Sequence, residues 1–238
     1  TTTDNTVTVE ENVTNKNGER DVDIIIDGVN VDTSDTSTPT EVSADTKEDK
    51  TIIKVGEGAD VDLTVKDSKL TTGGNGIDIG VDLDGKDENN ENDENKETNV
   101  DLTLDNTKIN LTENATAGIN ARDNSDVDIT LKGDNTIDGS EAIDKVTEGG
   151  GHDISKDNVN IEGIRVGGEG ASDSSDASEG ANTKLTISGG VEKTETAETD
   201  TEETESLAGG SLTISDTTGG LVMADGSDVE ITDGANVT

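Results

Sequence analysis

The chain of 238 residues contains no phenylalanine, tyrosine, tryptophan or cysteine, and only one proline, one histidine and one methionine. Without cysteine it forms neither a disulfide nor a thiolate metal site. Without aromatic side chains it lacks the flat apolar surfaces on which sugar rings stack, which argues against a conventional lectin site. Any hydrophobic core must therefore be built from aliphatic side chains alone.

Basic residues are also scarce. The chain has 17 Lys and Arg residues against 56 Asp and Glu residues, a formal net charge of −39. Binding to a phosphate backbone needs clustered basic side chains, so nucleic acid is excluded as an expected partner. No apolar run approaches the roughly 20 residues needed to cross a bilayer as a helix, so we expect no membrane insertion.

The low apolar content, 26%, is typical of disordered chains, but the apolar residues are not scattered. They form short alternations such as "DVDLTVKDSKL" over residues 60–70. In an extended strand Val61, Leu63 and Val65 would point to one side, and Asp62 and Thr64 to the other. Strict alternation of this kind predicts β-strands rather than helices.

This strand is repeated along the chain, as in "DVDIIIDGVNV" from Asp21, "NVDLTLDNTKI" from Asn99 and "DVDITLKGDNTI" from Asp126. The apolar residues that we take as equivalent are Ile24, Leu63, Leu102, Ile129, Leu185, Leu212 and Ile231, with Ile161 in a degenerate copy. A strand such as "IKVG" or "GIDIG" precedes several copies, and a short third strand such as "SKL" follows. Each repeat is thus predicted to contain two or three strands.

Such short strands cannot each enclose a core. Stacked in register about 4.8 Å apart, they would line one continuous interior with aliphatic rows. The sequence therefore predicts an all-β fold, a single parallel β-solenoid over residues 1–238. Four polar segments without periodicity are expected to be long, mostly acidic loops that leave this solenoid: residues 33–50, 84–98, 167–182 and 192–206.

The run "NVDLTLDNTKI…AGINARDNSDVDITLKGDNTIDGSEAI" resembles the right-handed parallel β-helix repeats of bacterial and archaeal cell-surface adhesin-like proteins, within the pectate-lyase-like fold. The resemblance covers roughly residues 20–238 and rests on alternation, Asn/Asp turns and Gly-Ile strand starts. It implies a right-handed β-helix and an extracellular structural role at the cell surface, as a stalk or adhesin segment or a filament subunit. It does not by itself imply an activity.

Enzymes of that fold suggest an alternative, a carbohydrate-binding or polysaccharide-lyase-like module acting on surface glycans. The resemblance would give Arg122 and Arg165 the basic role, near Asp78 or Asp123. A charge of −39 would repel an anionic substrate, and "GGGHD" around His152 lacks the glycine that follows histidine in the related hydrolases. We therefore predict no enzyme, with no catalytic and no cofactor-binding residues.

The outward positions carry many acids. In register, Asp23, Asp62, Asp101 and Asp128 would form a ladder, which Asn160 and Glu230 would continue and Lys184 would interrupt. Neighbouring carboxylates at this spacing repel by roughly 1 kcal/mol in water. Calcium prefers such oxygen ligands, so one interpretation is a structural Ca²⁺ site on these four aspartates. The other is that the acids confer solubility.

A second column, formed by Asp21, Asp60, Asn99, Asp126, Asn182 and Asp228, is expected to make local side-chain turns. A third consists of Thr64, Thr103, Thr130, Thr186, Thr213 and Thr232, which leaves an ice-binding solenoid as a further alternative. The candidate glycosylation sites are the sequons at Asn12, Asn110, Asn114 and Asn236.

The first and last segments, "NTVTVEENV" and "SDVEITDGANVT", are both strand-like. The unpaired edge of a strand invites pairing with another chain. We expect the partner to be a second copy of the protein, added head to tail, and a head-to-tail contact that does not close produces a filament.

Overall fold

The computed structural model describes residues 7–9, 21–34, 50–81, 83, 97–112, 115–142, 160–167, 183–190, 209–224 and 226–238. In this part of the chain the fold is all-β, with eighteen strands in three sheets of six strands each. Every strand pairing within these sheets is parallel. The predicted all-β class and parallel pairing are confirmed.

The three sheets are named here by the order in which the chain reaches them. The first sheet contains β1 (Val7–Val9), β4 (Ile53–Gly56), β7 (Ile77–Val81), β10 (Ala117–Ala121), β13 (Glu162–Val166) and β16 (Gly219–Met223). The second contains β2 (Asp21–Asp27), β5 (Asp60–Lys66), β8 (Thr98–Asp105), β11 (Ser125–Lys132), β14 (Lys184–Gly189) and β17 (Asp228–Thr232). The third contains β3 (Asn30–Asp32), β6 (Lys69–Thr72), β9 (Lys108–Leu111), β12 (Asp134–Asp138), β15 (Ser211–Ser215) and β18 (Asn236–Val237).

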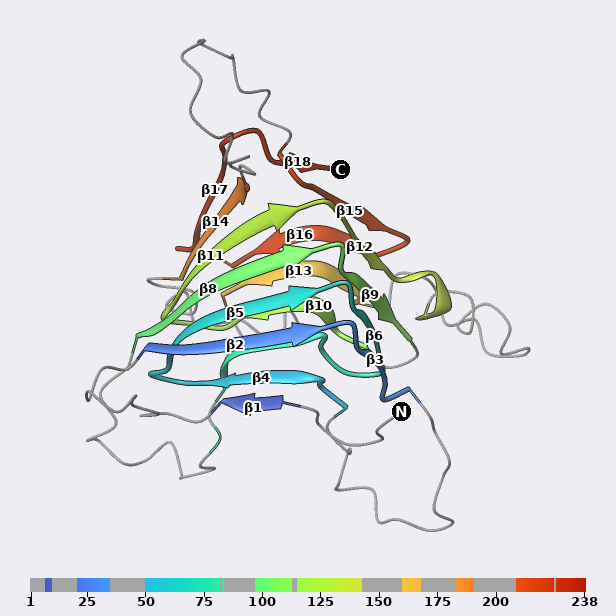
Figure 1. The fold of residues 1–238 in the computed structure, drawn as a ribbon, viewed down its shortest axis with the longest axis horizontal. Coiled ribbons are helices and arrows are strands. Elements are labelled where there is room, and N and C mark those ends of the chain that lie inside the picture. Colours follow the sequence, from blue (N-terminus) through green and yellow to red (C-terminus); the bar gives the residue numbers. More distant parts are fainter. Residues whose placement is uncertain are drawn as a thin grey trace, which may run out of the picture.

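The chain visits the three sheets in strict rotation, so each strand lies beside the strand three places earlier. We call each set of three successive strands a coil, from coil 1 (β1–β3) to coil 6 (β16–β18). Figure 1 shows the coils piled on one another, with β1 near one end of the pile and β18 near the other. The arrangement is consistent with a β-solenoid.

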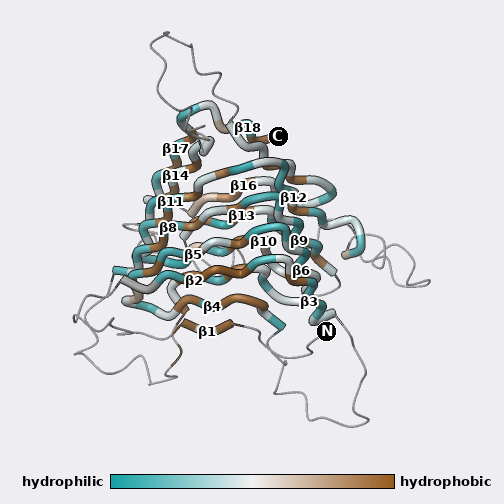
Figure 2. Tube along the Cα trace, in the orientation of Figure 1, coloured by the Kyte–Doolittle hydropathy of each residue, from teal (hydrophilic) through white to brown (hydrophobic). Residues whose placement is uncertain are grey.

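The register brings equivalent aliphatic residues over one another. Val61 pairs with Val100, and Val100 with Val127, as the alternation predicts. A second row in the same sheet consists of Ile24, Leu63, Leu102, Ile129, Ile187 and Ile231. Its four middle members are completely buried. Hydrophobic stretches recur from strand to strand in Figure 2, so the core is a set of continuous rows shared by all coils.

Three of the predicted equivalences are wrong. Leu185 pairs with Val127 and Val229, so Ile187 is the true member of the Ile129 row. Leu212 lies in β15 of the third sheet, and Ile161 precedes β13 of the first. For Leu185 the error is a shift of two residues, which keeps the same side chains facing inward, so alternation alone cannot detect it.

The turns after β5, β8 and β11 of the second sheet explain the recurrent Asn, Asp and Gly residues. Asp67, Asn106 and Gly133 follow β5, β8 and β11, and all three have a positive φ, between 45° and 60°. Asn and Asp tolerate this left-handed conformation better than other non-glycine residues. The Asn106 side chain also accepts a hydrogen bond from the backbone amide of Asp134 at 3.2 Å, which ties adjacent coils together.

The four predicted loops lie almost entirely outside the described residues. Thr98, which the sequence places in the second of them, is instead the first residue of β8. In the part of the chain that the structure describes, no helix has the length and apolar character needed to span a membrane.

The aliphatic rows give a direct test of the fold. Ile129 and Ile231 occupy the same row, but Ile129 is fully buried and Ile231 is 50% exposed. We expect Ile129→Ala to lower the free energy of unfolding by about 2–5 kcal/mol, because it leaves a cavity between two coils. Ile231→Ala should cost about 1 kcal/mol, since less apolar surface is lost. Urea unfolding at low ionic strength measures both, and equal losses would contradict the shared core.

Candidate functional site

The most distinctive surface feature is a row of carboxylates on the outer face of the second sheet. Asp23, Asp62, Asp101 and Asp128 pair in register on β2, β5, β8 and β11, as predicted, and all four are exposed. We call these four residues the acidic ladder. Adjacent strands lie about 4.8 Å apart, so each carboxylate has a like charge on the neighbouring coil. Like charges directly opposite one another destabilise a sheet.

The predicted continuation of the acidic ladder is partly wrong. Glu230 does continue the column, but Thr186 takes the place before it. Asn160 does not belong to the second sheet, because it precedes β13. Lys184 lies in the neighbouring column, where it pairs with Asp126 and Asp228. The sequence reading missed this because it matched Leu185 to the wrong row.

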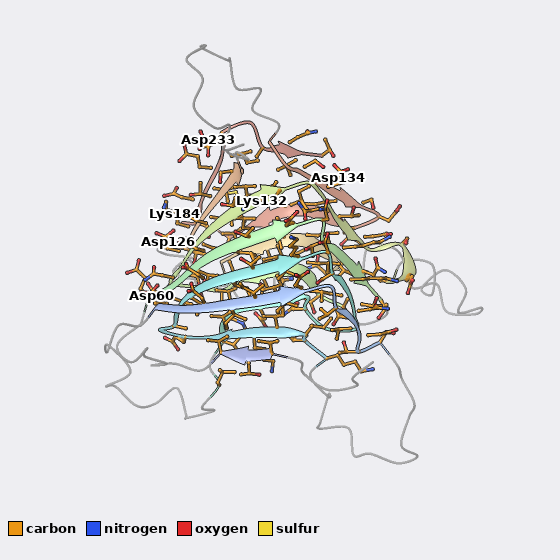
Figure 3. All side chains as sticks on the ribbon, in the orientation of Figure 1. Asp60, Asp126, Lys132, Asp134, Lys184 and Asp233 are labelled. Atoms are coloured by element: carbon orange, nitrogen blue, oxygen red, sulfur yellow. The ribbon has the colours of Figure 1, made fainter. Side chains whose placement is uncertain are left out.

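Lys184 instead relieves the second acidic column. Its Nζ lies 3.2 Å from Asp126 Oδ1; Lys184 is exposed and Asp126 is partly exposed. Figure 3 shows Asp60, Asp126 and Lys184 along one edge of the second sheet. The hydrogen bond with Asp126 raises the pKa of Lys184, and the charges of Asp126, Asp128 and Glu230 act in the same direction. One lysine is thus placed among several carboxylates.

The acidic ladder is a row and not a cluster. Within the described ranges, no three Asp, Glu, His or Cys side chains converge closely enough to hold a metal ion. Calcium is normally held by six to eight oxygens around one point, whereas a ladder supplies one carboxylate from each coil. This geometry fits cations gathered along the face as counter-ions better than one coordinated ion.

The first sheet carries a polar column that is mostly buried. Lys54, Asp78, Asn120 and Arg165 pair in register on the outer face of β4, β7, β10 and β13. The exposed fractions of Asp78, Asn120 and Arg165 are only 2%, 5% and 7%. Buried charges require partners, because the loss of hydration is otherwise very costly.

Asp78 is the centre of a hydrogen-bond network. Arg122 donates two hydrogen bonds to its carboxylate, from Nε and Nη2, each 2.9 Å long. Asn120 and Asn75 donate from their Nδ2 atoms at 2.8 Å and 3.0 Å. The predicted proximity of Arg122 and Asp78 is therefore confirmed, and the bidentate pair fixes both side chains.

Arg165 is held in the same manner by another carboxylate. Its Nε donates to Glu162 Oε2, and both side chains are buried. Sequence reasoning missed Glu162 and Asn120, although the triplets "IDI", "INA" and "IRV" place Asp78, Asn120 and Arg165 at one strand position. Because Arg122 and Arg165 both neutralise a neighbouring carboxylate, they do not form the basic cleft that the lyase alternative needs.

Two acids of the third sheet have altered ionisation. The side-chain hydrogen bond from Ser34 is the main cause that lowers the pKa of Asp32, and it outweighs the opposing effect of burial. For Asp138 burial raises the pKa, but hydrogen bonds from Ser140 and the charge of Lys108 together lower it below the usual value. Both carboxylates are therefore stabilised in the charged form.

The threonine column is less regular than predicted. Thr64, Thr103, Thr130 and Thr232 do share one column, but Thr186 belongs to the acidic ladder column and Thr213 to the third sheet. Ile25 and Ser188 occupy the remaining places. A flat face made only of threonine, as the ice-binding alternative would use, is not formed by these strands.

Three of the remaining candidates lie outside the described residues, and two lie in strands. His152, Asn12 and Asn114 lie outside the described residues. Asn110 is in β9 and is only 6% exposed, so the folded strand does not present it to solvent. Asn236 is exposed in β18.

Comparison with family models, curated proteins and solved structures finds no match to this chain. Its function therefore has to be inferred from the stacked rows, the acidic ladder and the buried ion pairs.

Removing one carboxylate from the acidic ladder should stabilise the protein. We expect Asp101→Asn to raise the free energy of unfolding by about 0.5–1 kcal/mol at low ionic strength, because repulsion from Asp62 and Asp128 is lost. The gain should disappear in concentrated NaCl, which screens exposed charges. Asp216→Asn, at the turn after β15, removes the same charge outside the ladder and is the control. An equal gain in both variants would show that only total charge matters.

Asp138 gives a pH-dependent prediction. Asp138→Asn keeps an acceptor for the Ser140 amide, which lies 3.0 Å from Asp138 Oδ1, and removes only the charge. Because the folded-state pKa is lowered, the carboxylate contributes stability above the ordinary pKa of 3.8 and loses it as the pH falls through the lowered value. The wild type should be more stable by up to about 1 kcal/mol at pH 7, and the difference should shrink as the pH falls below 3.8. Unfolding midpoints measured across this range check it, and a constant difference would contradict it.

Proposed function

We propose that the protein is an extracellular structural protein, a single right-handed parallel β-solenoid over residues 1–238 that serves as a segment of a cell-surface stalk or adhesin, or as the subunit of a filament. The observation that carries the proposal is the continuous parallel pairing of three sheets through six coils. Such a protein acts by its shape and stiffness, not by a reaction.

The uniform rows favour growth by stacking. Every coil meets the next through the same kind of contact, an aliphatic row covered by an aliphatic row. In repeat architectures of this type, stability comes from the interfaces between neighbouring units, and any further unit gains the same interface. A second copy added at either end would therefore meet a surface already suited to it.

The acidic surface determines the conditions under which copies can join. A net charge of −39 keeps separate copies apart in dilute salt. Dissolved cations reduce this repulsion, and calcium is the cation that an exposed row of carboxylates would attract most readily among those common outside cells. In this proposal Ca²⁺ is a counter-ion that strengthens contacts between and within copies, with the acidic ladder as its main location.

The carbohydrate alternative receives less support. It needs accessible basic side chains, whereas Arg165 is 7% exposed and bound to Glu162, and Arg122 is bound to Asp78. The side chains of the acidic ladder would also repel an acidic polysaccharide. Surface glycans thus remain a secondary choice of partner.

Electron microscopy tests the structural proposal. Negatively stained samples should contain separate particles in dilute buffer, and rods or fibres one stack wide in concentrated NaCl or in CaCl₂. At matched ionic strength CaCl₂ should give the longer assemblies, because a divalent ion neutralises adjacent carboxylates more effectively. Separate particles under all three conditions would contradict self-assembly, and release of unsaturated sugars from an acidic polysaccharide would favour the enzyme alternative.

A further inference from the structure

A column of glycines runs through the first sheet. Gly76, Gly118, Gly163 and Gly220 are in register immediately before or within β7, β10, β13 and β16. A Cβ atom on Gly76 would lie 2.5 Å from the carbonyl oxygen of Gly118, a Cβ on Gly118 2.7 Å from that of Gly163, and a Cβ on Gly163 2.6 Å from that of Gly220. These Cβ atoms would also lie within 2.8 Å of the Cγ2 atoms of Ile109, Ile137 and Ile214, respectively, so each glycine is required both by its own coil and by the backbone of the coil that follows it.

Gly220 is the exception in this column. A Cβ atom there would have no atom within 4 Å, and its φ is not in the left-handed region. Glycine within a strand costs about 0.5–1 kcal/mol relative to alanine, because it loses more backbone freedom on folding. No contact of Gly220 in this structure explains why glycine occupies the position, whereas a following coil would explain it.

The interior rows also indicate that this face of coil 6 is uncovered. Ile187 and Val166 are fully buried, but the next members of their rows, Ile231 and Met223, are 50% and 46% exposed. Leu221 is only partly buried as well. Coil 6 thus presents half-covered aliphatic side chains and an uncovered glycine on one face.

We propose that a second copy of this chain lies on that face, with its β1, β2 and β3 added in parallel to β16, β17 and β18. This identifies the contact by which copies stack, and so it depends on the proposed self-assembly. Val7 and Ile24 of coil 1 are only partly buried and would extend the rows of Leu221 and Ile231 without a change of spacing. Val9 and Val31, which also belong to coil 1, are already covered at 4% and 5% exposure, so they would gain little further burial from the contact.

Electrostatic repulsion opposes this contact. The register that joins Ile231 to Ile24 also places Glu230 beside Asp23 of the added copy. The Debye length falls from about 10 Å in 0.1 M salt to about 3 Å in 1 M salt, so the repulsion between such exposed groups is largely screened at the higher concentration. Association should therefore appear as the ionic strength rises, which distinguishes it from a contact held by ion pairs.

Sedimentation equilibrium of the full 238-residue chain in about 1 M NaCl tests the proposal. The wild type should form an open series of oligomers that grows with concentration, since a head-to-tail contact does not close. Gly220→Ala should weaken association at least about tenfold, because a methyl group at the equivalent Gly163 would lie 2.6 Å from a carbonyl oxygen of the following coil. The unfolding midpoint of the dilute variant should equal or slightly exceed that of the wild type, because the methyl group has free space in a single copy and alanine loses less backbone freedom on folding.

A second pair of variants is matched for chemistry. Ile231→Asn places an amide in the half-exposed row and should also weaken association. Ile25→Asn is the control, because Ile25 is 72% exposed on the outer face of β2 and does not belong to an interior row. The Ile25 variant should weaken association less than Ile231→Asn does, because Ile25 would meet only Thr232, on the outer face of the paired strands.

The outcomes separate this proposal from the broader one. Association that Gly220→Ala and Ile231→Asn leave unchanged would overturn the proposed contact while self-assembly stands. A closed dimer of the wild type would overturn the head-to-tail arrangement. Monomers at every salt and protein concentration would overturn both.

Discussion

The stacking of aliphatic side chains between adjacent coils is the constraint on which the structure depends. One coil of three short strands has no second layer against which to bury its apolar side chains. The chain also has no aromatic side chain that would enlarge the apolar surface of a single coil. Leu63, Leu102, Ile129 and Ile187 are completely buried because each lies between two others of the same kind. Burial of this kind contributes about 25 cal/mol per Å² of apolar surface, and the contribution is repeated in every row.

The same register imposes costs that the sequence must accommodate. Parallel pairing that places leucine over leucine also places aspartate over aspartate, so the acidic ladder follows from the core. Close approach of successive backbones demands glycine at Gly76, Gly118 and Gly163, immediately before or within β7, β10 and β13. On the outer face of the first sheet, buried carboxylates are instead neutralised by arginines, and these pairs fix side-chain positions rather than provide a reactive centre.

The local features could be predicted from the sequence because they depend on residues that lie close together in the chain. Alternation identified strands such as β5 and β8, and the repeated "DVDLT" pattern correctly matched Val61 with Val100 and Val127. The match failed at Leu185, since a shift by two residues leaves the inward and outward sides unchanged. Burial of Asp78 and Arg165 was not foreseen, because outward positions of an alternating strand normally face solvent.

The sequence by itself determined the all-β class, the parallel stacking of equivalent strands and the acidic ladder. These follow from side-chain alternation and from the repetition of one pattern, both of which are properties of the linear chain. Only the tertiary structure decided which polar residues are buried, that Arg122 binds Asp78, and that Gly220 lacks the covering strand that its equivalents have. Such properties depend on what lies beside a residue in the neighbouring coil, and residues separated by 40 or more positions meet there only after folding.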